Sequence, residues 1–557
     1  MSGDTYKYAK YVNSNQETRW ATIDEIRNSG TYIDLNKSSY PVAGLPLLSN
    51  AEEAYVDGED THTLIFGSTG SKKTRLICMP LINMMTRAGE SFIVTDPKGE
   101  LYDRTSGMAK KNGYRIVVLN FRDIGKGDMW NPLAIPYELY HTGQENAAVA
   151  MLNDFVTTIA EPQFEASKDI FWPNMASSLA LANLLLLMEC AKPEQVNVSN
   201  LAYLCTMAPR DALGRLSEMI PETHIAGLNY RSVFTSAEET LRSIYVSLYG
   251  MIRIFNIQRD LTQMLSGNTI DIRSFGREKT AVYIIVPDEK TTYHFLVTTF
   301  LKQVYEILIA EAQKEKKRML PIRVNFVLDE FCNIPKIPDM PSMISAARSR
   351  NMRYFLVVQS MHQLVSKYHN DADTIKGNCD NWVFLTSKEL QLLEEISSLC
   401  GSMYTSEGQV RKLISVSELQ RLDKAKGETL IMHARQYPII TELADIDSYE
   451  MFKGYAAVKM KAFRLPKPVF FSPIELYTRI TMGDCYIPFT TDIYKPPERP
   501  ARELSFEEWW NDEVEDTKDG DTKGEDEVTF DDLLDDDDYT LSEDEDAAEQ
   551  ASSDDTK

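Results

Sequence analysis

Eight short runs of mostly apolar residues recur along the chain and predict the strands of one sheet. They are HTLIF (62–66), SFIVTD (91–96), RIVVLN (115–120), TAVYIIV (280–286), VNFVLDE (324–330), RYFLVVQ (353–359), NWVFLT (381–386) and ETLIMHA (428–434). Most are continuously apolar rather than alternating, which is typical of strands covered on both faces. Helical patterns such as Thr74 to Arg87 and Tyr293 to Lys317 separate them. This alternation predicts an α/β fold with a mostly parallel sheet and helices on both faces.

The stretches between and after these runs divide the chain into segments. From about residue 140 to residue 275 the strand pattern is replaced by helical patterns, and after residue 465 the chain becomes rich in proline. The predicted organisation is an N-terminal segment (1–60), an α/β domain (61–139 and 276–465), an inserted all-α domain (140–275), an extended proline-rich segment (466–502) and an acidic tail (503–557).

The acidic residues are concentrated at the end of the chain. Residues 503–557 hold 25 acidic and 3 basic residues, whereas the other 502 residues hold 58 acidic and 56 basic. Such a segment cannot bury enough apolar surface to offset chain entropy, so we expect it to be disordered. Phe530, Leu533, Leu534 and Tyr539 are isolated apolar positions among its acidic residues. The tail is therefore either a solubilising segment or an arm that docks a basic partner.

Cysteine usage and hydropathy indicate the compartment. The seven cysteines show no C-x-x-C spacing, their number is odd, and no signal peptide is visible. We therefore expect free thiols in a reducing compartment and no zinc site. The most apolar run, Leu179 to Met188, is too short to span a bilayer and suits a buried helix. The expected location is the cytoplasm, with no transmembrane segment in this chain.

The first predicted strand runs into a glycine-rich turn, GSTGSKKT (67–74), and then into a predicted helix. This is the layout of a phosphate-binding loop, in which backbone N–H groups and the positive end of the helix surround phosphate oxygens. Lys73 would reach the β- and γ-phosphates, and the hydroxyl of Thr74 would bind Mg²⁺. We therefore expect ATP and Mg²⁺ here. The predicted loop residues are Gly67, Ser68, Thr69, Gly70, Ser71, Lys72, Lys73, Thr74 and Arg75.

One position departs from the loop pattern G-x-x-x-x-G-K-[ST], because Lys72 replaces the second glycine. The backbone N–H of Lys72 can still donate to phosphate, and its charge can add to the attraction. Its side chain can also crowd the γ-phosphate or displace Lys73. The sequence thus predicts nucleotide binding and leaves the rate of hydrolysis open.

Polar residues end two other predicted strands. Asp329 and Glu330 follow an apolar strand, where two acids are costly unless they face a cleft or a metal. We assign Asp329 to the outer sphere of Mg²⁺ and Glu330 to the base that polarises the attacking water. Gln359 is expected to sense the γ-phosphate or orient that water. Because ligands bind at the carboxyl ends of strands in open α/β sheets, these residues, the loop and Asp96 should meet there.

The segment before Gln359 carries Arg348, Arg350 and Arg353. We expect one of these arginines to reach the nucleotide of a neighbouring subunit and to stabilise charge there. The alternative for each arginine is a surface salt bridge.

These motifs together resemble those of type IV secretion coupling proteins, the TraG/TraD-like conjugation ATPases. The resemblance covers most of residues 18–465, and LDEFCNIPKIPDM is its most specific block. The blocks are TRWATIDEI (18–26), FIVTDPKGELY (92–102), NPL (131–133), DIFW (169–172), AEETLRSI (237–244), LDEFCNIPKIPDM (328–340), VVQS (357–360) and GETLIMHARQYPI (427–439).

The resemblance implies a RecA-like P-loop NTPase domain in a homo-hexameric ring. Such a ring moves single- or double-stranded DNA, or DNA-bound relaxase, toward a secretion channel. Its functional residues match Lys73, Thr74, Asp329, Glu330, Gln359 and, as the arginine acting in trans, Arg348. Asp96, Lys98 and Glu100 match the DPKGEL block, whose role is less defined.

Family members usually carry two transmembrane helices before the segment that resembles TRWATIDEI, and this chain starts almost at that segment. The resemblance then implies either a separate membrane anchor protein at the cytoplasmic face or a soluble version. The expected function is an ATP-driven coupling protein for conjugative export. The alternatives are a weakly or non-hydrolysing relaxase receptor and a hexameric DNA translocase of the segregation or packaging type.

Overall fold

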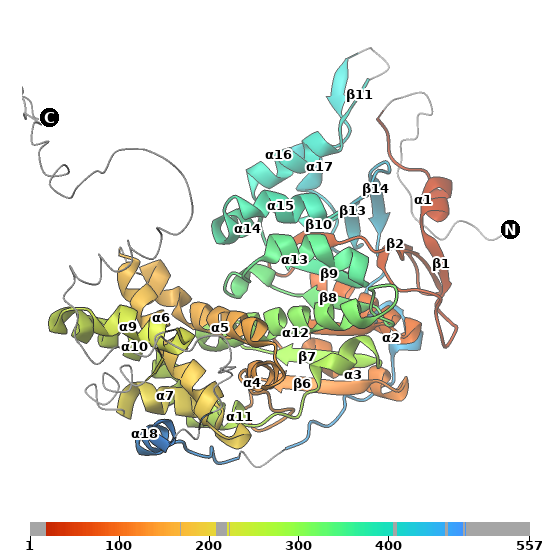
Figure 1. Cartoon of the computed structure of the whole chain (residues 1–557). Coiled ribbons are helices and arrows are strands. Elements are labelled where there is room, and N and C mark those ends of the chain that lie inside the picture. The colour runs from red at the N-terminus through yellow and green to blue at the C-terminus, as the bar shows by residue number, and fades with distance from the viewer. Residues whose placement is uncertain are drawn as a thin grey trace, which may run out of the picture. The chain divides into compact units, whose positions relative to one another are not determined.

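Nine strands form the central sheet of the computed structural model (Figure 1). They are β4 (Thr63–Gly67), β5 (Ser91–Thr95), β6 (Arg115–Asn120), β7 (Thr280–Ile285), β8 (Val324–Leu328), β9 (Met352–Val358), β10 (Asn381–Thr386), β13 (Glu428–His433) and β14 (Ile439–Glu442). Their order is β14-β13-β10-β4-β9-β8-β5-β7-β6. Pairing is parallel from β10 to β6, and β13 and β14 add antiparallel strands at one edge. All eight predicted runs form strands, and β14 is an additional one.

The structure describes residues 18–166, 169–207, 220–221, 223–404, 409–462, 466–482 and 485. All of these belong to one compact unit, Met1–Ile487. The tail predicted for 503–557 lies outside the described residues.

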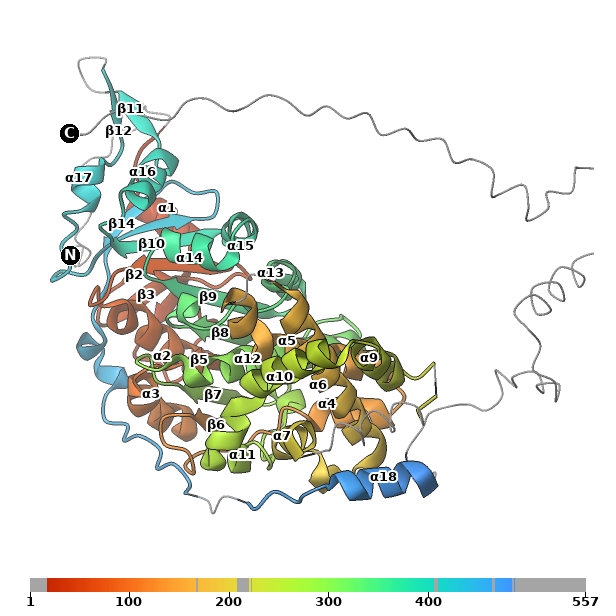
Figure 2. The same cartoon turned by 90° about the vertical axis from the view of Figure 1, so that its left-hand side faces the viewer.

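Both faces of the sheet are buried, which explains why the strand runs are continuously apolar. Along β5, Ile93 belongs to one hydrophobic core, whereas its neighbours Phe92 and Val94 belong to the other. Figure 2 shows helices on the two sides of the sheet. One side holds α2 (Met79–Ala88) and α3 (Glu100–Lys111), and the other α12 (His294–Lys314), α13 (Met340–Ala347), α14 (Met361–Tyr368), α15 (Asp371–Asn378) and α16 (Leu390–Leu399). The predicted α/β fold class is confirmed.

Between β6 and β7, the described residues form helices and no strand. These helices are α4 (Ala134–His141), α5 (Glu145–Ala166), α6 (Phe171–Cys190), α7 (Val198–Met207), α9 (Ile225–Phe234), α10 (Glu238–Ile257) and α11 (Arg259–Met264). Their apolar side chains share one core with α12 and one face of the sheet. The division of the chain at residues 139 and 276 stays a prediction.

Helix α6 contains the most apolar run of the sequence. Among the described residues it is the one helix long and apolar enough to cross a membrane, judged by length and composition. Within its apolar window, 67% is buried inside the protein. The core helix of a protein can have the same length and composition as a membrane-spanning helix. The run Leu179 to Met188 is buried, as the sequence predicts.

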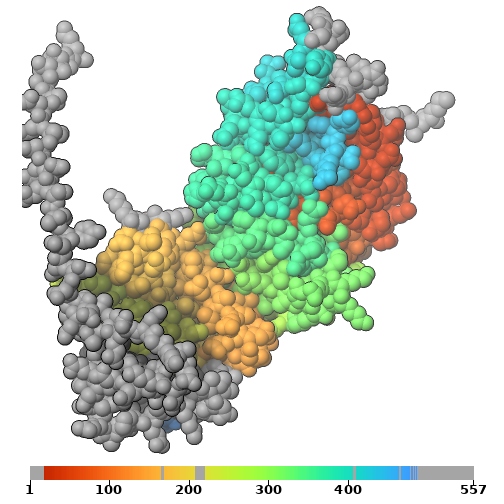
Figure 3. All heavy atoms as spheres, turned by 45° about the horizontal axis from the view of Figure 1, so that its top comes forward, coloured from red at the N-terminus to blue at the C-terminus, as the bar shows by residue number. Residues whose placement is uncertain are grey.

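The N-terminal segment has more structure than its polar sequence indicates. After α1 (Ile23–Ser29), strands β1 (Thr31–Asp34), β2 (Leu45–Ser49) and β3 (Glu53–Asp57) form an antiparallel sheet of order β1-β3-β2. This sheet lies against the region around β14 (Figure 3), where the Ser49 hydroxyl is 2.8 Å from that of Tyr449. The strands have four or five residues each, which is too short for a clear periodic signal.

The prediction of an extended segment over 466–502 is wrong for part of its length, because α18 (Pro473–Met482) forms there. Its sequence carries a start signal, since proline suits the first helical position and the Ser472 hydroxyl accepts from the N–H of Glu475 at 3.0 Å. Phe471, just before the helix, is fully buried.

The expectation of free thiols is wrong for one pair, because Cys190 and Cys485 form a disulfide across 295 positions of sequence. Packing of α18 near the end of α6 brings them together, so their spacing along the chain carried no signal. Five further cysteines are free thiols: Cys78, Cys205, Cys332, Cys379 and Cys400.

Shorter elements complete the described chain. Strands β11 (Ser402–Tyr404) and β12 (Val410–Lys412) form a hairpin before α17 (Val416–Leu419). A π-helical turn, η1 (Thr74–Cys78), precedes α2. The 3-10 turns are η2 (Pro193–Gln195), η3 (Ile272–Gly276), η4 (Thr291–Tyr293), η5 (Phe331–Asn333), η6 (Arg348–Arg350), η7 (Ile446–Ser448) and η8 (Glu450–Phe452).

Candidate nucleotide-binding site

The glycine-rich loop connects the end of β4 to the helical turn η1. Gly70 and Lys72 have φ angles of 75° and 69°, in the left-handed region. A side chain on Gly67 would place its Cβ 2.4 Å from the Ser71 hydroxyl and 2.8 Å from Lys73 Cγ. Gly67 is therefore required by the close approach of the loop to the strand end.

Lys73 and Thr74 stand at the start of the helix that follows the loop. The buried ammonium of Lys73 donates to the carbonyl of Gly67 at 2.7 Å and lies 3.6 Å from the carboxylate of Glu330. The hydroxyl of Thr74 donates to Asp329 Oδ2 at 3.3 Å. The loop and the end of β8 are thus joined by two polar contacts.

Asp329 and Glu330 follow directly on β8. Asp329 is buried, and this burial, with the Glu330 charge beside it, raises the pKa of its carboxyl to about 7. Glu330 has a φ angle of 56°, a conformation that non-glycine residues rarely adopt. A strained backbone at such a position turns the Glu330 carboxylate toward Lys73 instead of leaving it along the strand.

Gln359, at the end of the neighbouring strand β9, connects the acidic pair to the loop. Its amide donates to Glu330 Oε2 at 2.7 Å, and its oxygen accepts from the Thr69 hydroxyl at 3.4 Å. The order of β4, β9 and β8 in the sheet brings these three strand ends side by side.

The DPKGEL block follows β5 and closes another side of the site. The carboxylate of Asp96 accepts the N–H of Tyr102 at 2.8 Å, within the first turn of α3. Burial raises the pKa of Asp96 to about 6, although the backbone N–H groups of Tyr102, Leu101 and Gly99 oppose the rise. The left-handed φ of 78° at Gly99 turns the chain into α3. The block therefore shapes the turn between strand and helix beside the loop.

These groups line one cavity of about 320 Å³, formed by Thr69 to Arg75, Asp96, Pro97, Lys98, Glu100, Asp288, Asp329, Glu330, Asn333 and Gln359. The hydroxyl of Ser71 is buried there without a hydrogen-bond partner among the described residues. A donor in this position suits a phosphate oxygen. The described residues contain no group of three or more His, Cys, Asp or Glu side chains that could hold a metal. Mg²⁺ held by one or two side chains and substrate phosphates needs no such cage.

Lys72 lines the same cavity, but its ammonium lies 3.7 Å from Asp445, in the turn after β14. On the outer side of Lys72, a second and more open cavity is lined by residues 420–425. The ammonium of Lys424 in this segment lies 3.7 Å from the position that a Cβ on Gly70 would take. Asp445 and Lys424 belong to the surroundings of the loop, and no local sequence pattern marks either residue.

The predicted arginines do not reach this cavity in the same chain. Arg348 donates to Asp380 at 2.7 Å and to Asp60 at 3.2 Å. Asp60 and Asp380 precede β4 and β10, so Arg348 lies at the amino ends of the strands, opposite the loop. Its exposed fraction of 38% leaves it accessible at that edge.

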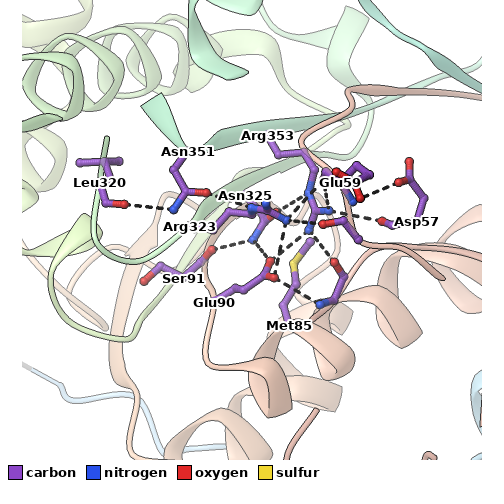
Figure 4. Close-up of polar contacts among 12 residues, drawn as sticks. Asp57, Glu59, Met85, Glu90, Ser91, Leu320, Arg323, Asn325, Asn351 and Arg353 are labelled. Carbon is purple, nitrogen blue, oxygen red and sulfur yellow. Dashed lines mark hydrogen bonds and ion pairs between the residues drawn. The ribbon is translucent and has the colours of Figure 1, made fainter. Parts of the chain in front are cut away.

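Arg353 cannot act on a neighbouring subunit, because it is fully buried (Figure 4). Its guanidinium donates to Glu90 at 3.0 Å and to Asn325 at 2.8 Å. Of the three arginines, Arg353 is therefore excluded as the one that acts in trans. Arg350 donates to the carbonyl of Ala346 at 3.3 Å.

The structure thus brings Lys73, Thr74, Asp329, Glu330 and Gln359 together at the carboxyl ends of parallel strands, and it places Arg348 at the opposite edge. A fold with this loop and acidic pair defines a P-loop NTPase class of site. The model of the family described as type IV secretory system conjugative DNA transfer matches residues 19–428. The chain belongs to that family.

Curated relatives have related sequences but are longer. Conjugal transfer protein TraG of Escherichia coli is 24% identical over 371 residues, which cover 63% of this chain and 56% of TraG. Protein VirD4 of Agrobacterium fabrum is 22% identical over 472 residues, which cover 80% of this chain and 65% of VirD4. The chain thus spans between about half and two thirds of the length of these relatives.

Solved structures of the plasmid coupling protein TrwB share the fold. TrwB in complex with the ATP analogue ADPNP gives a TM-score of 0.57 at 14% identity, over 83% of this chain and 98% of TrwB. TrwB in complex with ADP and Mg²⁺ gives a TM-score of 0.54 at 13% identity, over 84% of this chain and 99% of TrwB. At these identities the likeness shows the common fold.

Proposed function

We propose that this chain is a coupling ATPase of a conjugative type IV secretion system. It binds ATP with Mg²⁺ at the glycine-rich loop and uses ATP hydrolysis to deliver relaxase-bound DNA to the transfer channel. The observation that carries the proposal is the carboxylate of Glu330, which lines the loop cavity and contacts both the ammonium of Lys73 and the amide of Gln359. Family membership and the nucleotide complexes of TrwB support it.

Each residue of the cavity has a distinct task in this proposal. Lys73 neutralises phosphate charge, and the hydroxyl of Thr74 with Asp329 would hold Mg²⁺, which supplies further neutralisation at the phosphate oxygens. Glu330 accepts a proton from the attacking water. The hydrogen bond from Gln359 fixes the direction of the Glu330 carboxylate.

The partners follow from the family. We propose a homo-hexamer when assembled, with relaxase and DNA as substrates and a secretion channel or membrane anchor protein at the cytoplasmic face of the membrane. Arg348, accessible at the opposite edge of the sheet, is then available to a neighbouring subunit's nucleotide. The acidic tail would dock a basic partner protein rather than DNA, because its charge repels phosphate.

The test is DNA-stimulated ATP hydrolysis by the assembled protein. Glu330→Gln should lower kcat by about a hundredfold or more while nucleotide affinity changes little, because only the proton acceptor is removed. Lys73→Ala should weaken nucleotide binding as well. Glu394→Gln, on the exposed side of α16, is the matched control. Equal activity of the wild type and Glu330→Gln would remove the motor part of the proposal.

A second candidate is a receptor that binds nucleotide and relaxase but hydrolyses ATP weakly or not at all. The observation that favours it is the lysine at position 72, in a left-handed conformation that suits glycine. In the same assay, Lys72→Gly should then raise a near-zero rate. Robust hydrolysis by the wild type excludes this candidate.

A further inference from the structure

Lys72 keeps the backbone of the glycine that the loop pattern calls for, and only its side chain is new. Its φ angle of 69° is in the region where glycine is unstrained and other residues pay about 1–2 kcal/mol. The N–H groups around it can therefore converge on phosphate as in a glycine-containing loop. What distinguishes this loop is a second ammonium group next to that of Lys73.

That ammonium group stands at the border of two cavities. Lys72 lines the loop cavity, where the carboxylates of Asp329 and Glu330 and any phosphate would attract it. It also lines the outer cavity, where Arg421 and Lys424 repel it and where the carboxylate of Asp423 is already paired with Lys426 at 3.4 Å. The side on which the Lys72 ammonium lies therefore depends on an anion close to it and outside the loop cavity.

Asp445 is such an anion, and its position does not depend on Lys72. The guanidinium of Arg75 donates to both oxygens of Asp445, by Nε at 3.1 Å and by Nη2, and also to Asp447. Arg104 donates to the other oxygen of Asp447 at 3.2 Å. Although burial opposes it, the hydrogen bonds from Arg75 hold the pKa of Asp445 below its usual value.

We propose that Asp445 is a positioning residue of the nucleotide site, which holds the ammonium of Lys72 away from the phosphate position so that Lys73 is the loop lysine that faces the phosphates. The proposal rests on the proposed function, since it concerns the same phosphate site. It explains how this chain carries a lysine where the loop pattern has glycine. The pair joins the loop to the turn after β14, with Nζ and Oδ2 3.7 Å apart.

A double-mutant cycle tests the proposal, with Mg·ADP affinity measured by calorimetry and kcat by ATP hydrolysis. In the chain that keeps Lys72, Asp445→Asn should lower the Kd for Mg·ADP by about three- to tenfold, because the released ammonium turns to the phosphates. Slower ADP release should lower kcat. In a Lys72→Met background, the fold-change in Kd caused by the same substitution should be smaller by a factor of about three or more. The reason is that no ammonium is left to move.

Asp447→Asn is the matched control in the same turn, since Asp447 contacts Arg75 and Arg104. It should change the Kd by the same factor in both backgrounds. Equal effects of Asp445→Asn in both backgrounds overturn the proposal, because Asp445 would then act through Arg75 or through the general field. Urea unfolding of the nucleotide-free variants is a second readout. If the shifts of the unfolding midpoint caused by Asp445→Asn and Lys72→Met simply add in the double variant, the proposal is also overturned.

The failure of the proposed function has a different signature. If no variant binds Mg·ADP, the nucleotide site itself is refuted, and this role of Asp445 with it. If all variants bind Mg·ADP and the two backgrounds respond alike, the nucleotide site stands and the positioning role alone is refuted.

Discussion

At the scale of single residues, burial of the Asp96 carboxyl beside the loop makes the stability of the fold depend on pH. Asp96 is 1% exposed, yet its carboxylate serves as the acceptor for the N–H of Tyr102 at the start of α3. Burial raises the pKa of Asp96 to about 6, above the value near 4 of an unfolded aspartate. The native state therefore binds the proton more tightly than the unfolded state between these two pH values. Stability from this group is present at low pH and is lost as the pH rises through about 6.

Asp96→Asn should remove this pH dependence while its side-chain oxygen keeps the bond to Tyr102. Above pH 7, the free energy of unfolding of the variant should exceed that of the wild type by on the order of 2 kcal/mol. This gain in stability should vanish near pH 4. Urea unfolding at several pH values, in EDTA and without nucleotide, measures the difference. A gain that is the same at all pH values would contradict the prediction.

At the scale of elements, a buried polar network joins the amino ends of the strands (Figure 4). Arg353 on β9 donates to Glu90, which precedes β5, and to the carbonyls of Glu59 at 3.0 Å and Ala43 at 3.0 Å. Asn325 on β8 donates to Glu90 at 2.9 Å. Burial lowers the pKa of Arg353 to about 10. The network thus ties the N-terminal sheet to the central one.

Arg353→Met should destabilise the fold by about 3 kcal/mol, because it removes the ion pair at 3.0 Å and leaves the Glu90 carboxylate only the longer pair with Arg323 at 3.9 Å. Thermal unfolding near neutral pH measures the loss. Arg350→Met is the control on the neighbouring turn and should cost less than about 1 kcal/mol. Similar losses for the two variants would show that the network contributes little.

Elements with long or unbroken apolar patterns lie where the sequence predicts them. The eight apolar runs, α2, α12 and the buried helix around Leu179 to Met188 all lie where the sequence indicates. The sequence did not indicate the short strands β1, β2, β3 and β14, which obtain their stability from neighbouring strands rather than from their own composition. The strands β4, β5 and β8 are equally short, but their apolar runs are unbroken. Helix α18 had a local start signal in Ser472 and Pro473 that outweighed the proline-rich surroundings.

At the scale of the whole molecule, the segment after β14 connects distant parts of the described chain. It pairs with the loop through Asp445, with α3 through the hydrogen bond from the Tyr102 hydroxyl to Val458 at 2.6 Å, and with α7 through Asn200. Asn200 accepts the N–H of Phe471 at 3.0 Å and donates to Val469 at 2.8 Å. Of the described parts of this segment, 443–462 thus contacts the loop and α3, and 466–482 contacts the helices between β6 and β7.

Phe471→Ala should release this segment from the helices, since the side chain is fully buried in the core that contains α6 and α7. A loss of about 3–4 kcal/mol is expected, together with faster tryptic cleavage near Lys467. Phe470→Ala is the matched control, because that neighbouring side chain is 60% exposed. Equal cleavage rates in the two variants would argue against a fixed segment.

The sequence by itself determined the sheet strands, the loop and the polar residues at the strand ends, because these depend on local patterns and on the rule that parallel strands end together. It also determined the family, through blocks spread over most of the chain. The tertiary structure decided which residues become partners across long separations. It paired Arg75 with Asp445 across 370 positions, joined Cys190 to Cys485, placed Arg348 opposite the loop and buried Arg353. Such contacts depend on how elements pack, and packing leaves no local pattern from which a partner can be inferred.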